Sequence, residues 1–117
     1  MKWTIIIIAM ILAASCADVV NPSLKDRKVT LLAPANNVVS SDSLQTFYWE
    51  ELEDSLQYQL QVVSPGFDSI VRLEADTTVR RNRLSLKLRP AVYEWRVRAL
   101  SYGGASMYSD IFRLTIR

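Results

Sequence analysis

Residues 84–99 alternate between apolar and polar side chains, and this pattern limits the fold more than any other feature of the sequence. The apolar positions are Leu84, Leu86 and Leu88 before a break at Pro90, and Tyr93, Trp95, Val97 and Ala99 after it. A period of two places successive side chains on opposite faces of a strand, so that one face is buried and the other meets water. The stretch therefore predicts two half-buried antiparallel strands joined by a tight corner.

Several shorter stretches have strand patterns of their own. The expected strands cover residues 29–33, 44–50, 57–63, 67–74 and 108–117. The expected turns and loops cover residues 34–43, 50–55, 64–66 and 101–106. Residues 75–82 follow no clear pattern. Seven short strands at this spacing, with no helical stretch after Cys16, indicate an all-β sandwich.

The expected sandwich resembles the fibronectin type III domain over about residues 29–117. The residues that carry the resemblance are Trp49, Tyr58, Leu88, Pro90, Tyr93, Trp95 and the pair Tyr108 and Ser109. The segment from Leu88 to Tyr93 resembles the tyrosine corner of that family, in which the tyrosine hydroxyl bonds to backbone a few residues upstream. The resemblance implies a seven-stranded antiparallel, immunoglobulin-like sandwich. We expect its core to include Trp49, Tyr58, Trp95 and Phe112.

The N-terminus has the layout of an export signal. Lys2 is followed by an uncharged apolar run from Trp3 to Ala14, and small residues lead directly into Cys16. This run is too short to span a membrane, which needs about 20 apolar residues. A cysteine directly after the small residues resembles the lipobox of bacterial lipoproteins. An ordinary secretory signal followed by an incidental cysteine is the alternative.

The lipobox resemblance implies that the signal peptide, residues 1–15, is removed and that Cys16 receives a lipid. Residues 16–28 would then form the lipidated cysteine and a tether, and residues 29–117 the domain. The expected location is the bacterial cell envelope, anchored to a membrane, with the outer membrane favoured. Several acyl chains would make such attachment effectively permanent.

The composition argues against catalysis and against most cofactors. The chain has no histidine and one cysteine, which removes Ser-His-Asp and Cys-His nucleophiles and the usual zinc ligands. The acidic loop at residues 50–54 lacks Asp-x-Asp spacing, so neither a metal site nor a cofactor is expected. The formal net charge of +2 does not suggest nucleic-acid binding. We therefore expect a protein that is not an enzyme.

Two groups of residues are candidates for partner binding. Gln57, Gln59 and Gln61 should share an outward sheet face with Arg96, Arg98 and Arg113. Such a face could dock an acidic partner, a glycan or lipid headgroups, although it is also what the solvated side of an antiparallel sheet looks like. Tyr102 and Met107, in and just after a glycine-containing loop, could form a paratope-like contact or merely a hairpin tip.

These observations predict a lipid-anchored, non-catalytic binding or scaffolding module of the cell envelope. Its partner would be an envelope protein or a polysaccharide, bound through the loops or the Gln/Arg-rich sheet face. The alternative is an accessory or inhibitory subunit of an envelope enzyme or transport complex.

Overall fold

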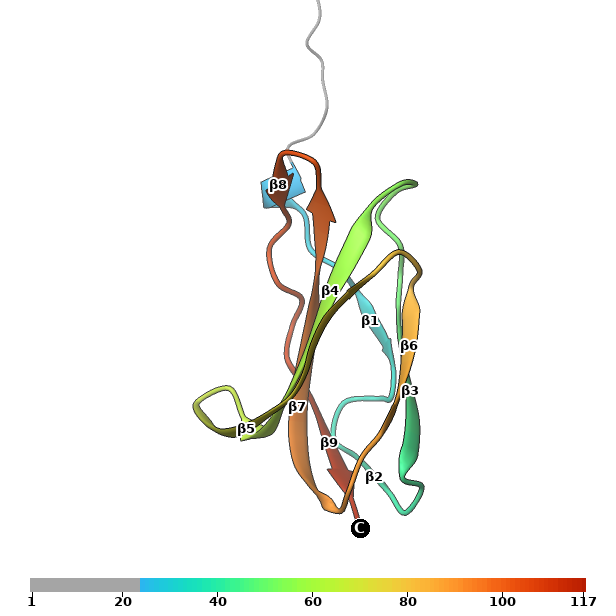
Figure 1. The fold of residues 1–117 in the computed structure, drawn as a ribbon, viewed down its shortest axis with the longest axis vertical. Coiled ribbons are helices and arrows are strands. Elements are labelled where there is room, and N and C mark those ends of the chain that lie inside the picture. The colour runs from blue at the N-terminus through green and yellow to red at the C-terminus, as the bar shows by residue number, and fades with distance from the viewer. Residues whose placement is uncertain (1–23) are drawn as a thin grey trace, which may run out of the picture.

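The computed structural model describes residues 24–117, and the predicted signal peptide and Cys16 lie outside this range. The described chain begins with a 3-10 turn and continues as nine strands (Figure 1). The elements are η1 (Leu24–Asp26), β1 (Leu31–Ala33), β2 (Val38–Ser40), β3 (Leu44–Trp49), β4 (Gln57–Gly66), β5 (Ser69–Val79), β6 (Arg83–Lys87), β7 (Ala91–Ser101), β8 (Gly104–Ala105) and β9 (Phe112–Ile116). Residues 24–117 contain no helix long and apolar enough to cross a membrane.

The strands form two sheets packed face to face. The smaller sheet has the order β1-β3-β6, and the larger has the order β2-β9-β7-β4-β5, with β8 paired to the end of β7. Every pair is antiparallel except β2 and β9, which run parallel. The predicted all-β sandwich is confirmed.

Two predicted turns were wrong, and one predicted strand is longer than expected. Residues 34–43, expected as a turn, contain β2, because Val38 to Ser40 pair with β9 at the far end of the chain. Residues 64–66, also expected as a turn, belong to β4, which accommodates Pro65 at a register shift in its pairing with β5. β5 covers most of the strand predicted over residues 67–74 and extends through residues 75–79, where no clear pattern was found. Its hairpin with β4 projects beyond the other strands (Figure 1).

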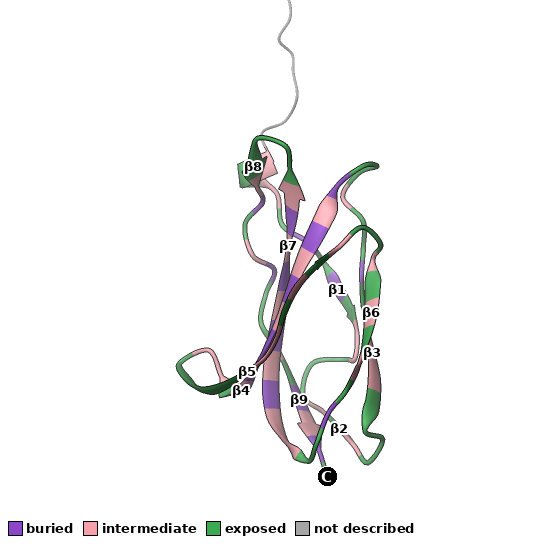
Figure 2. Cartoon of the chain, viewed as in Figure 1, coloured by how far each residue is buried: buried purple, intermediate pink, exposed green. Residues whose placement is uncertain are grey.

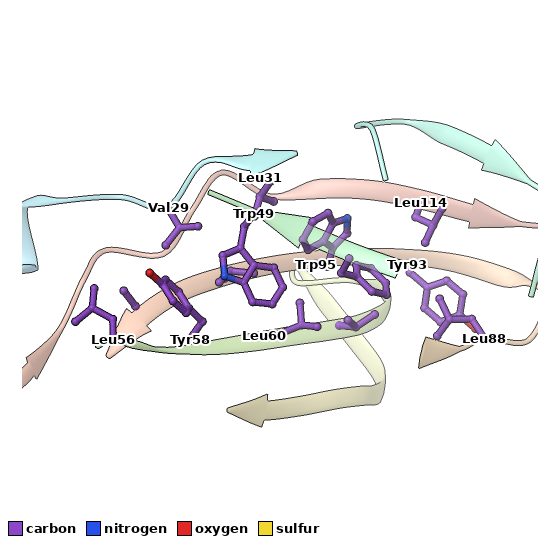
Figure 3. Packing of buried hydrophobic residues seen from close by; sticks show 14 of the residues in the cluster. Val29, Leu31, Trp49, Leu56, Tyr58, Leu60, Leu88, Tyr93, Trp95 and Leu114 are labelled. Carbon is purple, nitrogen blue, oxygen red and sulfur yellow. The ribbon is translucent and has the colours of Figure 1, made fainter. Parts of the chain in front are cut away.

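The core lies between the sheets and is built around aromatic rings. Trp49, Tyr58, Tyr93 and Trp95 are all fully buried (Figure 3). Buried and less buried positions alternate along β4 and β7 (Figure 2). The Phe47 ring meets Trp95 edge-on at 4.8 Å between centroids. Such edge-to-face pairs are favourable because the positive ring edge meets the negative ring face.

Phe112 occupies the margin of this core. Its ring is only partly buried, although it packs edge-on against Trp95 at 5.9 Å. Phe112 begins β9, where the strand joins the exposed segment that precedes it. Phe112 therefore covers one side of the Trp95 ring and lies at the edge of the core, not at its centre.

The corner between β6 and β7 is closed by a tyrosine hydroxyl. Tyr93 Oη donates a hydrogen bond to the carbonyl of Arg89 at 2.6 Å. Leu88 is buried beside it, whereas Pro90 is exposed. Because Pro90 fixes its own φ and biases Arg89 away from helical geometry, the chain crosses from one sheet to the other here.

The segment 24–28, which the sequence places in the tether, lies against the domain. The turn η1 packs beside β8, and the Met107 N–H donates to the carbonyl of Arg27 at 2.9 Å. Arg27 also pairs with Glu53 at 3.1 Å, and Lys28 pairs with Asp110 at 2.8 Å. The segment thus enters the fold at the end that carries β8, while the C-terminus lies at the opposite end (Figure 1).

Candidate binding face on the larger sheet

The outward face of β4 and β7 carries two glutamines opposite two arginines. In the antiparallel register Gln59 pairs with Arg98, and Gln61 pairs with Arg96. The alternate residues of both strands point into the core, which forces these four side chains to the other face of the sheet. All four are partly buried, because they cover one another.

Each arginine on this face is held by a glutamine. Arg98 Nε donates to Gln59 Oε1 at 2.7 Å, and Arg96 Nε donates to Gln61 Oε1 at 2.9 Å. Both glutamines donate in turn to Asp76 on β5, at 2.8 Å and 3.2 Å. The carboxylate of Asp76 therefore orients both amides, and each amide presents its oxygen to a guanidinium.

Aromatic rings contact the guanidinium groups of both arginines. The Arg96 guanidinium carbon lies 3.8 Å from the Tyr108 ring centroid and 4.2 Å from that of Phe67. The Arg98 guanidinium carbon lies 4.7 Å from the Tyr108 ring. These are cation–π distances, which fix the guanidinium planes without neutralising their charge. We call Gln59, Gln61, Phe67, Asp76, Arg96, Arg98 and Tyr108 the Arg/Gln face.

Two serines position Tyr108 by forming hydrogen bonds to the backbone of β7, as a neighbouring strand would. Ser106 Oγ accepts the Ala99 N–H at 2.8 Å, and Ser109 Oγ accepts the Val97 N–H at 3.0 Å. Their own N–H groups donate back to the carbonyls of Ala99 and Val97. The segment between β8 and β9 is thereby fixed along β7. Tyr108 lies within this segment, between the two serines.

Arg113 lies on the same sheet face but is already neutralised. It forms an ion pair with Glu94 at 3.0 Å. The other carboxylate oxygen of Glu94 accepts the Phe67 N–H at 2.8 Å, which fixes the start of the β4–β5 turn. Gly66 fits beside this carboxylate only because it has no side chain, since a Cβ there would lie 2.6 Å from Glu94 Oε1.

Arg96 and Arg98 differ from Arg113 in their charge balance. Within residues 24–117, no carboxylate lies within ion-pairing distance of either guanidinium. Their Nε atoms are used, whereas their Nη atoms have no hydrogen-bond partner in the described chain. The face thus presents two oriented positive groups.

The structure does not bring Tyr102 or Met107 to this face. Tyr102 is fully exposed in the turn between β7 and β8, beside a hollow of about 460 Å³ that it shares with the acidic loop of Glu51 and Glu53. Met107 is half-exposed, and its backbone pairs with the segment before β1. Both belong to the end of the sandwich where the N-terminal segment enters.

The sequence predicted the glutamines and arginines of this face but not the contribution of Phe67, Asp76 or Ser106. Tyr108 and Ser109 were expected only as part of the fold resemblance and not as members of this face. The sequence signal for this arrangement was the pair of serines that flanks Met107 and Tyr108, but serine is equally common in ordinary loops. In residues 24–117 no cluster of three or more cysteine, aspartate or glutamate side chains could hold a metal ion.

No family model matches the sequence, and no curated protein matches it. Among solved structures, a fibronectin(III)-like module of Clostridium thermocellum CbhA superposes with a TM-score of 0.55 at 17% identity, over 76% of this chain and 96% of that one. The fold is fibronectin type III-like.

Two human domains give similar results. The fibronectin type III domain of fibronectin type III domain containing protein 3 superposes with a TM-score of 0.55 at 14% identity, covering 82% of this chain and 90% of that one. The PKD domain of KIAA0319 gives a TM-score of 0.50 at 14% identity, with 87% and 92% covered. Identities this low establish the fold alone, so function has to be argued from the Arg/Gln face.

Proposed function

We propose that this chain is a lipid-anchored, non-catalytic binding module of the bacterial cell envelope that docks a partner protein through the Arg/Gln face. The observation that carries the docking role is the pair of uncompensated arginines, Arg96 and Arg98. A solvated sheet face needs polar side chains, but it does not need them held rigidly by amides and rings. Side chains already fixed in place lose less entropy on binding, which favours affinity.

The lipid anchor of the proposal rests on the lipobox-like sequence before Cys16. Eight peptide units separate Cys16 from Leu24, which limits the reach to less than about 30 Å at full extension. A domain held this close would present to the membrane the end that carries η1 and β8. The Arg/Gln face would then stand roughly perpendicular to the membrane surface and would be accessible to neighbouring envelope proteins.

Membrane fractionation tests the anchor. The wild-type protein should partition into the detergent phase, and Cys16→Ser should release it or leave an uncleaved precursor. A wild-type protein recovered in the aqueous phase with a free Cys16 thiol would remove the anchor from the proposal.

Cross-linking in intact cells, followed by purification and mass spectrometry, tests the docking face. The double variant Arg96→Gln/Arg98→Gln should lose the cross-linked partner. The double variant Arg80→Gln/Arg81→Gln removes the same charge from an exposed turn between β5 and β6 and should keep it. Equal losses in the two variants would show that net charge, and not this face, holds the partner.

A further inference from the structure

The spacing of Arg96 and Arg98 suggests the shape of what they bind. The two residues are two positions apart on one face of β7. Successive side chains on one face of a strand are about 7 Å apart. An extended peptide has the same two-residue repeat, so carboxylates at its positions i and i+2 match the two guanidinium groups.

The free edges of the guanidinium groups define how a ligand approaches. A guanidinium has five N–H donors in one plane, and in both arginines the Nε donor is occupied by a glutamine oxygen. Rings at 3.8 Å and 4.2 Å flank the Arg96 group, which leaves its Nη edge as the open approach. In-plane approach to that edge is the geometry in which arginine binds a carboxylate with two hydrogen bonds.

Neighbouring charges restrict the path of an anionic ligand. Asp76 lies on the β5 side of the two glutamines and would repel a carboxylate there. On the other side, Tyr108 is uncharged, and Arg113 is balanced by Glu94. The favourable path for an acidic segment therefore follows β7 along the two arginines.

We propose that Arg96 and Arg98 bind an extended acidic peptide segment of a partner protein, with one carboxylate of an acid-x-acid sequence on each guanidinium. This inference rests on the proposed docking role of the Arg/Gln face and specifies its ligand. The glutamines and Asp76 act as positioning residues, because they orient the arginines and do not touch the ligand.

Fluorescence anisotropy with labelled pentapeptides tests the ligand, using the whole protein purified in detergent at low ionic strength. The probe is Thr-Asp-Thr-Asp-Thr. Its controls are Thr-Asn-Thr-Asn-Thr, whose side chains carry no charge, and Thr-Asp-Asp-Thr-Thr, whose adjacent carboxylates point to opposite sides. The probe should bind about tenfold or more tightly than either control, since a hydrogen bond to a charged group contributes roughly 1.5–3 kcal/mol.

Variants separate the site from general charge. Arg98→Gln should weaken probe binding about tenfold or more, and Arg98→Lys should restore part of it, because lysine keeps the charge but not the planar donor pair. Arg81→Gln, on an exposed turn, is the matched control and should bind as the wild type does. Equal weakening by Arg81→Gln, or equal binding of the two aspartate peptides, would overturn the proposal.

A uronic-acid oligosaccharide is included in the same assay, because its carboxylates offer similar chemistry. Binding of this glycan in place of the peptide would overturn the assignment to a peptide segment. A protein that binds no peptide but still loses its cross-linked partner in Arg96→Gln/Arg98→Gln would refute the acidic-peptide inference and leave the proposed docking function standing.

Discussion

The two faces of the β4–β7 pair are built from alternating residues of the same strands, yet their side chains are held by different interactions. On the inner face Leu60 and Val97 are fully buried, and Trp95 is enclosed by other rings. On the outer face Gln59 and Arg98 are partly exposed and joined by hydrogen bonds. Inward burial removes apolar surface from water, at about 25 cal/mol for each Å², whereas outward pairs exchange bonds to water for bonds to each other.

The difference shows that order and stability are separate properties. Exposed polar pairs contribute at most about 1 kcal/mol each, so the outer face adds little to the free energy of unfolding. It nevertheless holds Arg96 and Arg98 in place through hydrogen bonds to glutamines and contacts with aromatic rings. A surface that is ordered but contributes little to stability is suited to binding a partner, because its side chains lose less entropy when the partner binds.

The largest expected effect lies on the inner face, at Trp95. Trp95→Ala should lower the free energy of unfolding by about 3–5 kcal/mol, because it removes a large buried ring and leaves a cavity. Chemical denaturation monitored by far-UV circular dichroism measures the change. Trp95→Phe should cost clearly less, since it keeps a ring and Trp95 Nε1 has no hydrogen-bond partner in residues 24–117 to lose. Equal losses in the two variants would contradict the cavity explanation.

A smaller effect is expected where the inner face meets the corner. Tyr93→Phe keeps the buried ring and removes only the hydrogen bond to the Arg89 carbonyl. The loss should be about 0.5–1.5 kcal/mol, the usual net contribution of one such hydrogen bond. Denaturant melts of this variant and the wild type give the difference. A neutral result would remove the structural role assigned to the corner hydroxyl.

The two buried tyrosines, Tyr93 and Tyr58, make the free energy of unfolding depend on pH in the alkaline range. Burial raises the pKa of Tyr93 and of Tyr58 above the ordinary value near 10. The unfolded chain therefore loses these protons first, so the stabilisation is complete below about pH 10 and declines as pH rises through the folded-state values. Urea melts from pH 8 to 11 should show this decline, with a shallower slope in Tyr93→Phe. Tyr102→Phe, at an exposed turn, is the control, and the same loss of slope there would refute the assignment to buried tyrosines.

The smallest expected effect lies on the outer face. Gln61→Ala removes the amide between Asp76 and Arg96, yet it should change stability by less than about 1 kcal/mol, because the groups it frees can bind water. Thermal melts check this value. In the peptide assay the same variant should weaken binding, since Arg96 loses its orientation. A large drop in stability would mean that the outer face is part of the structural core after all.

The sequence predicts which residues lie on each face of the sheet, but it does not predict which residues on one face contact each other. Strict alternation on β4 and β7 determines which residues point outward, because neighbouring side chains in a strand cannot share a face. The pairing of Gln61 with Arg96 depends on strand register between segments 35 residues apart in the chain, which no local pattern encodes. The position of Tyr108 depends on Ser106 and Ser109, whose hydroxyls imitate backbone pairing within an apparent loop.

The two strands that differ most from expectation, β2 and β5, lie at the two edges of the larger sheet. β2 has three residues and pairs in parallel with a strand at the other end of the chain, so its polar surroundings dominate the pattern. β5 lies at the edge of the larger sheet and has exposed apolar residues and a register shift, which together remove the alternation. Edge strands are often irregular in this way, because regular exposed edges invite unwanted pairing.

The parallel pairing of β2 with β9 has a mechanical consequence. Segment 24–28 enters at one end of the sandwich and the C-terminus leaves at the other (Figure 1). A pull applied between these two ends would slide β2 and β9 past each other along their length. The bonds around this pair, including Asn37 N–H to Arg113 O and Arg117 N–H to Ser40 O, would then bear the load together and would not open one at a time. A domain joined in this way should resist tension along its long axis better than its modest size suggests.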